Sequence, residues 1–265
     1  MTVRPFSRLD NVGADQRRHA FSYLDAAAGH PEIQRVRSVA MEMLAPSPGE
    51  RLLEAGCGTG EVARQLASWV GSTGSVTAMD LSAQAIEVAR SRDVGLSVTY
   101  AVGDVMALEY GNGHFDGVRC ERVLQWVDDP DAAIRELARV TRPGGRICVI
   151  DTGDLKAASW DGFDHAEEVI AEVDAAAGNR TSGRTIRSRM VQAGLQQTTT
   201  LPVTLRFLSP EDAAVVLPHF NDAYMRERLP GELRAQFNAS VARAAARGDF
   251  LFAFTMWISV GRVSG

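Results

Sequence analysis

The chain has 265 residues and a formal net charge of −5, with 45% hydrophobic and 23% charged residues. This composition is typical of a soluble globular protein with one full core, so we expect a single domain with insertions. The acidic balance disfavours a nucleic-acid partner, which would require a basic face. No apolar run reaches membrane-spanning length, and residues 1–20 lack the apolar core of a signal peptide. We therefore expect a cytoplasmic protein without a membrane partner.

Three isolated cysteines, Cys57, Cys120 and Cys148, form no C-x-x-C pair. No cluster of histidines accompanies them, so we expect no metal site. Each cysteine falls near the end of a predicted strand, which is typical of small buried hydrophobic residues.

A regular alternation of strands and helices follows an amphipathic helix that is predicted over residues 32–44 from the helical spacing of its apolar residues. The predicted strands cover residues 51–55, 75–80, 97–102, 115–120 and 146–151, and the predicted helices cover 61–69, 83–90 and 131–140. Short loops between such elements predict a parallel sheet with helices on both faces. Ligands bind sheets of this kind beyond the carboxyl ends of the strands.

The pattern loosens after residue 151. Residues 155–178 and 185–193 are predicted to be helical, and residues 195–208 and 250–260 are predicted as the last two strands. Most of the intervening segment, 209–249, also has a helical pattern. Residues 1–30 are polar and only weakly patterned.

The most informative motif follows the first predicted strand, where residues 54–60 read Glu-Ala-Gly-Cys-Gly-Thr-Gly. Glycines in such a turn let bare backbone approach a ligand. Asp80 ends the next strand, and an acid there accepts the ribose hydroxyls of an adenosine in doubly wound folds. The loop is G-x-G-x-G rather than the dinucleotide G-x-G-x-x-G, and Glu54 and Glu61 flank it. These carboxylates would repel a pyrophosphate but suit a sulfonium that carries an α-amino group.

Residues 48–151 resemble the class I S-adenosylmethionine-dependent methyltransferases, in the small-molecule group that includes the ubiquinone and menaquinone biosynthesis type. The glycine-rich loop resembles motif I of this family. Four further elements match in order: Asp80, Val102-Gly103-Asp104-Val105, Phe115-Asp116-Gly117-Val118 and Arg142-Pro143-Gly144-Gly145-Arg146.

The resemblance implies an α/β fold with a doubly wound, Rossmann-like, seven-stranded and mostly parallel sheet, a C-terminal antiparallel strand and helical lid insertions. It implies an S-adenosylmethionine-binding methyltransferase domain over residues 46–265, with lid segments at about 154–182 and 209–249. Residues 1–45 would form an N-terminal helical segment that closes over the site.

The resemblance also implies that the cofactor is S-adenosyl-L-methionine. The residues expected near its methionine end are Glu54, Gly56, Cys57, Gly58, Gly60 and Cys120. Glu54 would hydrogen-bond around the amino group, directly or through water. The residues expected at the adenosine end are Asp80 on the ribose, Leu81 beside the adenine, and Asp104 and Val105 on the adenine polar edge. Tyr23 resembles an N-terminal aromatic residue that closes over the cofactor in related enzymes.

Methyl transfer from a sulfonium is an in-line displacement, so the protein need only align the acceptor and exclude water. After the fourth strand the family often reads Val-Leu-His-His, whereas this chain has Gln125 and Trp126 at the last two of these positions. We expect a roomy apolar pocket for a small hydrophobic acceptor, such as a natural product or quinone-like metabolite. Its expected lining is Gln125, Trp126, Trp160, Phe163, Phe220 and Tyr224. His165 and His219 are candidate bases, because the ordinary pKa of histidine is close to working pH.

Three other interpretations stay open, together with the acceptor atom and the oligomeric state. A nucleic-acid or protein methyltransferase would share this fold, but residues 120–123 are Cys-Glu-Arg-Val rather than Asn/Asp-Pro-Pro-Tyr, and no basic domain is appended. Salt-sensitive binding to RNA or DNA would favour it. A short-chain dehydrogenase would require Tyr-x-x-x-Lys, which the sequence lacks. A non-catalytic protein would bind S-adenosylmethionine without any turnover.

Overall fold

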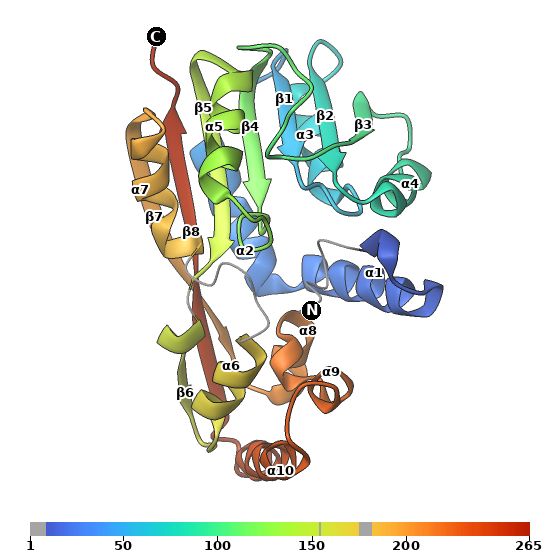
Figure 1. The fold of residues 1–265 in the computed structure, drawn as a ribbon, viewed down its shortest axis with the longest axis vertical. Coiled ribbons are helices and arrows are strands. Elements are labelled where there is room, and N and C mark those ends of the chain that lie inside the picture. The colour runs from blue at the N-terminus through green and yellow to red at the C-terminus, as the bar shows by residue number, and fades with distance from the viewer. Residues whose placement is uncertain (1–8, 154, 175–181) are drawn as a thin grey trace.

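The computed structural model describes residues 9–153, 155–174 and 182–265, and one long sheet organises it (Figure 1). The eight described strands are β1 (Arg51–Ala55), β2 (Ser75–Asp80), β3 (Val98–Val102), β4 (Phe115–Glu121), β5 (Thr141–Thr152), β6 (Ser159–Asp161), β7 (Gln196–Phe207) and β8 (Leu251–Arg262). Their order is β3-β2-β1-β4-β5-β8-β6, and β7 also pairs with β8. β1 to β5 are parallel, whereas β8 is antiparallel to all three of its neighbours.

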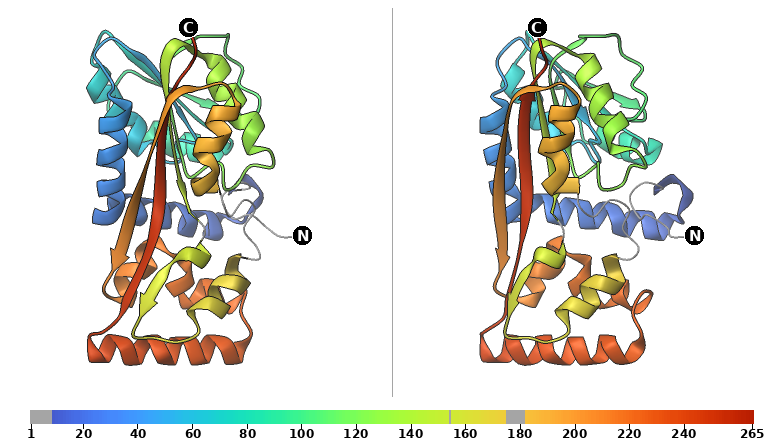
Figure 2. Two further views of the ribbon diagram at one scale, coloured as in Figure 1. Left: turned by 90° about the vertical axis from the view of Figure 1, so that its left-hand side faces the viewer. Right: turned by 60° about the vertical axis from the view of Figure 1, so that its left-hand side comes forward.

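Helices cover both faces of the parallel strands (Figure 2). One face carries α2 (Pro31–Leu44), α3 (Glu61–Val70) and α4 (Ala83–Ser91), and the other carries α5 (Pro130–Val140) and α7 (Ser182–Gln192). Side chains alternate along β1, so that Leu52 belongs to the first apolar cluster and Leu53 to the second. Both are buried, which explains why the parallel strands have nearly continuous apolar sequences.

A second group of elements, which we call the lower lobe, is built on the far end of β8 (Figures 1 and 2). It comprises β6, α6 (Ala166–Asp174), α8 (Pro210–Val216), η3 (Pro218–Phe220), α9 (Asp222–Arg226), α10 (Gly231–Arg247) and the adjoining ends of β7 and β8. The last residues of β8 pair with β5, whereas Leu251 to Ala253 pair with β6. One strand therefore runs through both parts of the molecule.

The helix α1 (Ala14–Gly29) crosses the molecule between the carboxyl ends of the parallel strands and the lower lobe (Figure 1). It contacts α2 on one side and α8 on the other. A short helical turn, η1 (Leu9–Asn11), precedes it and lies against α4. The N-terminal segment therefore borders the edge of the sheet where ligands bind in this architecture.

The α/β fold class that the sequence predicts is confirmed, with a mostly parallel sheet and an antiparallel C-terminal strand. One detail was wrong. The sheet has eight strands rather than seven, because residues 159–161, predicted as helix, form the short strand β6. The N-terminal segment, which was expected to be helical, contains the 16-residue helix α1. The proposed division into domain and lids stays a prediction, and residues 154 and 175–181 of the first lid lie outside the described residues.

The described part of the chain lacks two features. It contains no helix that is both long and apolar enough to cross a membrane. Within the same residues, no group of three or more His, Cys, Asp or Glu side chains is placed to hold a metal ion.

Candidate functional site

The glycine-rich loop joins β1 to α3 and is tied to the end of β2 by its own backbone. The N–H groups of Gly56 and Cys57 both donate to the carbonyl of Met79, at 2.8 Å. The N–H of Gly58 donates to Oδ2 of Asp80, at 2.9 Å. These bonds hold the loop and the carboxylate in one fixed arrangement at the carboxyl ends of two neighbouring strands.

Two glycines of this loop have different physical reasons to be there. A Cβ on Gly56 would lie 2.2 Å from Cγ2 of Val123, so the loop that follows β4 packs directly on this backbone. Gly58 has a φ of 52°, but a Cβ there would have no protein atom within 4 Å. The backbone at Gly58 is therefore not covered by other protein atoms, so a ligand can approach it closely.

Asp80 ends β2 with a carboxylate that is already held from two sides. Its Oδ1 accepts from the N–H of Ser82 at 3.0 Å, opposite the bond from Gly58. Burial raises the pKa of Asp80, and the backbone hydrogen bonds oppose that rise. Each oxygen keeps a further lone pair that can accept a hydroxyl.

An exposed apolar pair lies beside Asp80. Leu81 follows Asp80 in sequence, and Val102 pairs with Asp80 in the β2–β3 register. The residues Leu81 and Val102 are 53% and 54% exposed. Large apolar side chains at such exposure fit a flat ring that packs on them. Leu81 was expected beside the adenine, whereas Val102 was expected only as part of a family motif. Its signal was an apolar residue at a strand end next to Gly103 and Asp104.

Asp104 follows β3 and turns the chain back on itself. Its Oδ1 accepts from the N–H of Met106 at 2.8 Å, and the residue bridges to Ala107. The side chain of Val105 is buried in the core, so this residue would offer a ligand only its backbone.

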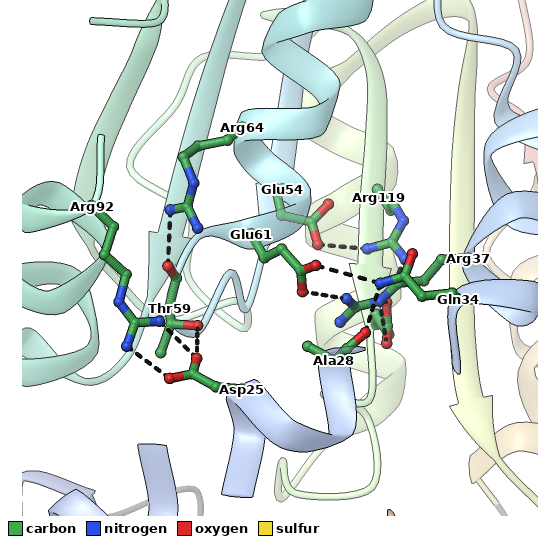
Figure 3. A network of polar contacts seen from close by, with 11 residues as sticks. Asp25, Ala28, Gln34, Arg37, Glu54, Thr59, Glu61, Arg64, Arg92 and Arg119 are labelled. Carbon is green, nitrogen blue, oxygen red and sulfur yellow. Dashed lines mark hydrogen bonds and ion pairs between the residues drawn. The ribbon is translucent and has the colours of Figure 1, made fainter. Parts of the chain in front are cut away.

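A buried charge network lies under the glycine-rich loop (Figure 3). Arg119 of β4 bonds Glu54 of β1 at 2.7 Å and also contacts Glu121. Arg37 of α2 bonds Glu61 at 2.7 Å and Glu121 at 3.1 Å. The network thereby connects two strands, the first turn of α3 and the helix α2.

The composition of this network favours a ligand that brings a positive charge. It holds three carboxylates, from Glu54, Glu61 and Glu121, against the two guanidinium groups of Arg37 and Arg119. Within the described residues, the buried Oε2 of Glu54 has no hydrogen-bond partner. Burial raises the pKa of Glu54, whereas at Glu121 the two arginines outweigh burial and hold the pKa well below its ordinary range. An ammonium group near Oε2 of Glu54 would satisfy both the charge and the open acceptor.

The N-terminal segment is fastened to the loop by two carboxylates. Asp25 of α1 accepts from the hydroxyl of Thr59 at 3.1 Å and forms a bidentate ion pair with Arg92 at 2.6 and 2.7 Å (Figure 3). Asp10 accepts from the hydroxyl of Ser82 at 2.6 Å and from the N–H of Ala83, the first residue of α4, at 2.9 Å. This segment therefore borders the loop between β1 and α3 and the end of β2.

Tyr23 connects the same helix to the lower lobe. Its hydroxyl donates to the carbonyl of Val216 in α8. Burial raises the pKa of Tyr23 to about 12, so the phenol stays protonated. The expected contact of Tyr23 with the cofactor stays a prediction.

Asp151, which the sequence analysis did not single out, anchors the loop that follows β4. Its Oδ2 accepts from the N–H of Gln125 at 3.0 Å and its Oδ1 from the N–H of Thr152 at 2.8 Å. The side chain is completely buried, and this burial raises its pKa to about 7. Its position could have indicated a functional role in the sequence, because Asp151 lies near the end of an apolar strand, as Asp80 does.

The cysteines of the expected site are not reactive thiols. Cys120 is fully buried in the apolar cluster under α5 and α7. Burial raises the pKa of the thiols of both Cys57 and Cys120 well above the ordinary value. Neither residue is therefore set up as a nucleophile.

The six expected acceptor-pocket residues fall into two groups in the structure. Gln125 and Trp126 are half-buried at the end of β4, whereas the other four belong to the lower lobe. Phe163 is buried and stacks on Phe250 with ring centres 5.0 Å apart, and Phe220 meets Phe252 edge to face at 5.1 Å. These contacts place Phe163 and Phe220 in the packing of the lower lobe.

The remaining residues of the second group lie at the margins of the lower lobe. Tyr224 lies under the guanidinium of Arg228, 3.7 Å from the ring centre. Trp160 is half-buried on β6.

Of the two candidate bases, His219 is buried in η3, and His165 has a φ of 65° and lies 3.7 Å from Glu168. Their predicted roles stay predictions.

Comparisons with known proteins agree with this geometry. A family model described as a methyltransferase domain matches residues 53–149. An uncharacterized 37.1 kDa protein of transposon TN4556 from Streptomyces fradiae is 31% identical over 252 residues, which cover 92% of this chain and 71% of that protein. A ubiquinone/menaquinone biosynthesis C-methyltransferase of Bdellovibrio bacteriovorus is 36% identical over 109 residues, which cover 40% of this chain and 46% of that enzyme. The match thus spans about half the length of the enzyme.

Among solved structures, phosphoethanolamine N-methyltransferase 2 of Haemonchus contortus, in complex with S-adenosyl-L-methionine, is similar with a TM-score of 0.64. The superposition covers 99% of this chain and 60% of that one, at 18% identity. At this identity the likeness shows the fold alone.

Proposed function

Because the chain belongs to the class I S-adenosylmethionine-dependent methyltransferases, we propose that it methylates a small hydrophobic acceptor held between the strand ends and the lower lobe. The acceptor class is a natural-product or quinone-like metabolite. The observation that carries the proposal is the open backbone at Gly58, which lies between the anionic network around Glu54 and the carboxylate of Asp80.

The residues of the site fit the parts of S-adenosylmethionine. The open Oε2 of Glu54 suits the α-ammonium group, and the surplus carboxylate of its network suits the cation as a whole. Asp80 has lone pairs for the ribose hydroxyls. The exposed side chains of Leu81 and Val102 suit the two-ring adenine.

Bound S-adenosylmethionine supplies an electrophilic methyl group on a sulfonium. The acceptor atom forms a bond to the methyl carbon as the carbon–sulfur bond breaks, and the acceptor loses its proton to water or a base. The protein contributes alignment and exclusion of water. The α1 helix, fastened at Asp25 and Tyr23, would cover one side of the site, and the lower lobe would cover another.

The test uses a pair of matched glycine variants. Gly58 and Gly248 have φ values of 52° and 77°, and a Cβ at either position would have no protein atom within 4 Å. Gly58→Ala and Gly248→Ala therefore impose similar backbone strain, of about 1 kcal/mol. Only Gly58 lies in the proposed site; Gly248 caps the C-terminal end of α10.

Titration calorimetry with S-adenosylhomocysteine should show at least tenfold weaker binding for Gly58→Ala and wild-type affinity for Gly248→Ala. Equal affinity in both variants would contradict the site. Methyl transfer to a panel of hydroxylated aromatic and quinol acceptors then tests catalysis. Tight cofactor binding without transfer to any panel member would favour the non-catalytic interpretation.

A further inference from the structure

Arg122 occupies a strained position at the carboxyl end of β4. Its φ is 55°, in the left-handed region that residues other than glycine rarely adopt. Two hydrogen bonds hold the turn: its N–H donates to the carbonyl of Ile150 at 2.8 Å, and its carbonyl accepts from Nε2 of Gln125 at 3.4 Å. Backbone strain of this kind persists only where the surrounding structure enforces it, and it clusters at ligand sites.

The guanidinium of Arg122 lies where three elements meet. Burial raises the pKa of Tyr23 on α1 and of Asp151 on β5, and the charge of Arg122 partly offsets the rise at both. It also acts on Glu121 of β4, in addition to Arg37 and Arg119. Because Tyr23 bonds Val216 of α8, this position faces the junction between the strand ends and the lower lobe.

The acids around Arg122 are already committed to other donors. Glu121 pairs with Arg119 and Arg37. Both oxygens of Asp151 accept backbone N–H groups, and the hydroxyl of Ser182 adds a further bond. The only acid among its sequence neighbours, Glu121, is therefore not a free counter-ion for it.

Arg122 itself is half-buried, and its guanidinium makes no hydrogen bond or ion pair to any side chain or carbonyl that the structure describes. Without such a partner, the donors of this half-buried residue remain available to a ligand. Its planar fork of donors matches a carboxylate or phosphate group, which it can bind through two parallel bonds.

We propose that Arg122 binds an anionic group, a carboxylate or phosphate, of a ligand in the site, and that the acceptor supplies this group. The inference rests on the proposed function and narrows its substrate class from hydrophobic metabolites to those that carry an acid. The second possible source of the same chemistry is the methionine carboxylate of the cofactor. Two arms of one experiment distinguish the sources.

The experiment compares the wild-type protein with Arg122→Gln, which keeps an unbranched side chain at the strained φ and removes the charge. Arg135→Gln on α5 is the matched control, because that side chain is 61% exposed and lies 3.7 Å from Asp129. Thermal melts check that both variants fold. One arm measures the affinity for S-adenosylhomocysteine and for 5′-methylthioadenosine, which lacks the amino-acid part.

The other arm titrates protein saturated with S-adenosylhomocysteine with 4-hydroxybenzoate, phenyl phosphate and the neutral 4-hydroxybenzamide. We expect Arg122→Gln to lose at least fivefold in affinity for an acidic probe while both nucleosides bind normally. A loss confined to S-adenosylhomocysteine would keep the anion site but assign it to the cofactor.

Unchanged affinity for every probe in Arg122→Gln would overturn the inference alone. Failure of the wild-type protein to bind S-adenosylhomocysteine would overturn the proposed function, and the inference with it. A loss that Arg135→Gln shares would show a general effect of charge and would also contradict the assignment.

Discussion

Asp151 holds the end of β5 to the loop after β4 through the N–H of Gln125, and its carboxyl group is completely buried. Burial moves its pKa from 3.8 in the unfolded chain to about 7 in the folded protein. Between these two values the folded protein keeps a proton that the unfolded chain has released. The free energy of unfolding that Asp151 contributes is therefore complete below about pH 4 and is lost as the pH rises to about 7.

Asp151→Asn should remove this pH dependence. The variant cannot ionise, although it loses one acceptor and is less stable by a constant amount at every pH. Urea denaturation at pH 5 and pH 8 should show a smaller decline in the free energy of unfolding for the variant than for the wild type. The difference is about 3 kcal/mol, because roughly two pH units separate pH 5 from the pKa of about 7 in the folded protein. Parallel pH profiles for the two proteins would contradict this role of Asp151.

The sequence could place Glu54, Gly58 and Asp80 at neighbouring strand ends, because motif order and strand alternation fix which residues meet at that edge. It could not reveal that Asp151 is completely buried or that Arg122 adopts a positive φ. Both properties depend on which donors and acceptors the folded chain brings from distant elements. A lone acid or arginine in a sequence carries no sign of that.

The α1 helix shows the same limit for a whole element. Of its described residues, only Ala27 and Ala28 are buried, so it lacks the apolar stripe that marks an amphipathic helix in a sequence. Polar contacts hold it instead, through Asp25 to Thr59 and Arg92 and through Tyr23 to Val216. In contrast, α2 buries five apolar residues, and its bounds were predicted to within one residue.

Loss of the Asp25 contacts should loosen α1 over the glycine-rich loop. Asp25→Ala removes the bonds to Thr59 and Arg92. Because the side chains of Arg92 and Asp25 are 38% and 40% exposed, these bonds are worth roughly 1 kcal/mol together. Dissociation of S-adenosylhomocysteine, followed by stopped flow, should become about fivefold faster. Amide hydrogen exchange across residues 14–29 should increase in parallel.

Asp15→Ala is the control for this prediction, because Asp15 lies on the same helix and pairs only locally with Arg18 among the contacts described. Its dissociation rate should match that of the wild type. Equal rates in Asp25→Ala and Asp15→Ala would show that α1 does not restrict release of the ligand.

At the scale of the whole molecule, β8 runs from the parallel sheet into the lower lobe, and one apolar cluster continues from the sheet face under α2 and α3 to the rings of the lower lobe. The end that pairs with β5 belongs to the parallel sheet, and the end that pairs with β6 carries a cluster of rings. These rings are Phe163, Phe220, Phe237, Phe250 and Phe252. The expected cofactor residues of the sheet all precede β5, so they lie on other elements than the rings of the lower lobe.

This difference in position predicts different effects on the lower lobe and on cofactor binding when the ring cluster is opened. Phe250 is buried and stacks on Phe163, so Phe250→Ala should cost about 3–5 kcal/mol in the lower lobe. Hydrogen exchange should rise in α10 and β6, and methyl transfer to the acceptor should fall. Affinity for S-adenosylhomocysteine should stay within about twofold of wild type, because β1, β2 and their loops are untouched.

The control is Leu208→Ala, because Leu208 is 65% exposed; hydrogen exchange, methyl transfer and cofactor affinity should all match the wild type. If cofactor affinity instead fell together with lower-lobe protection, β8 would be transmitting the damage, and the two parts would have to be treated as one cooperative unit.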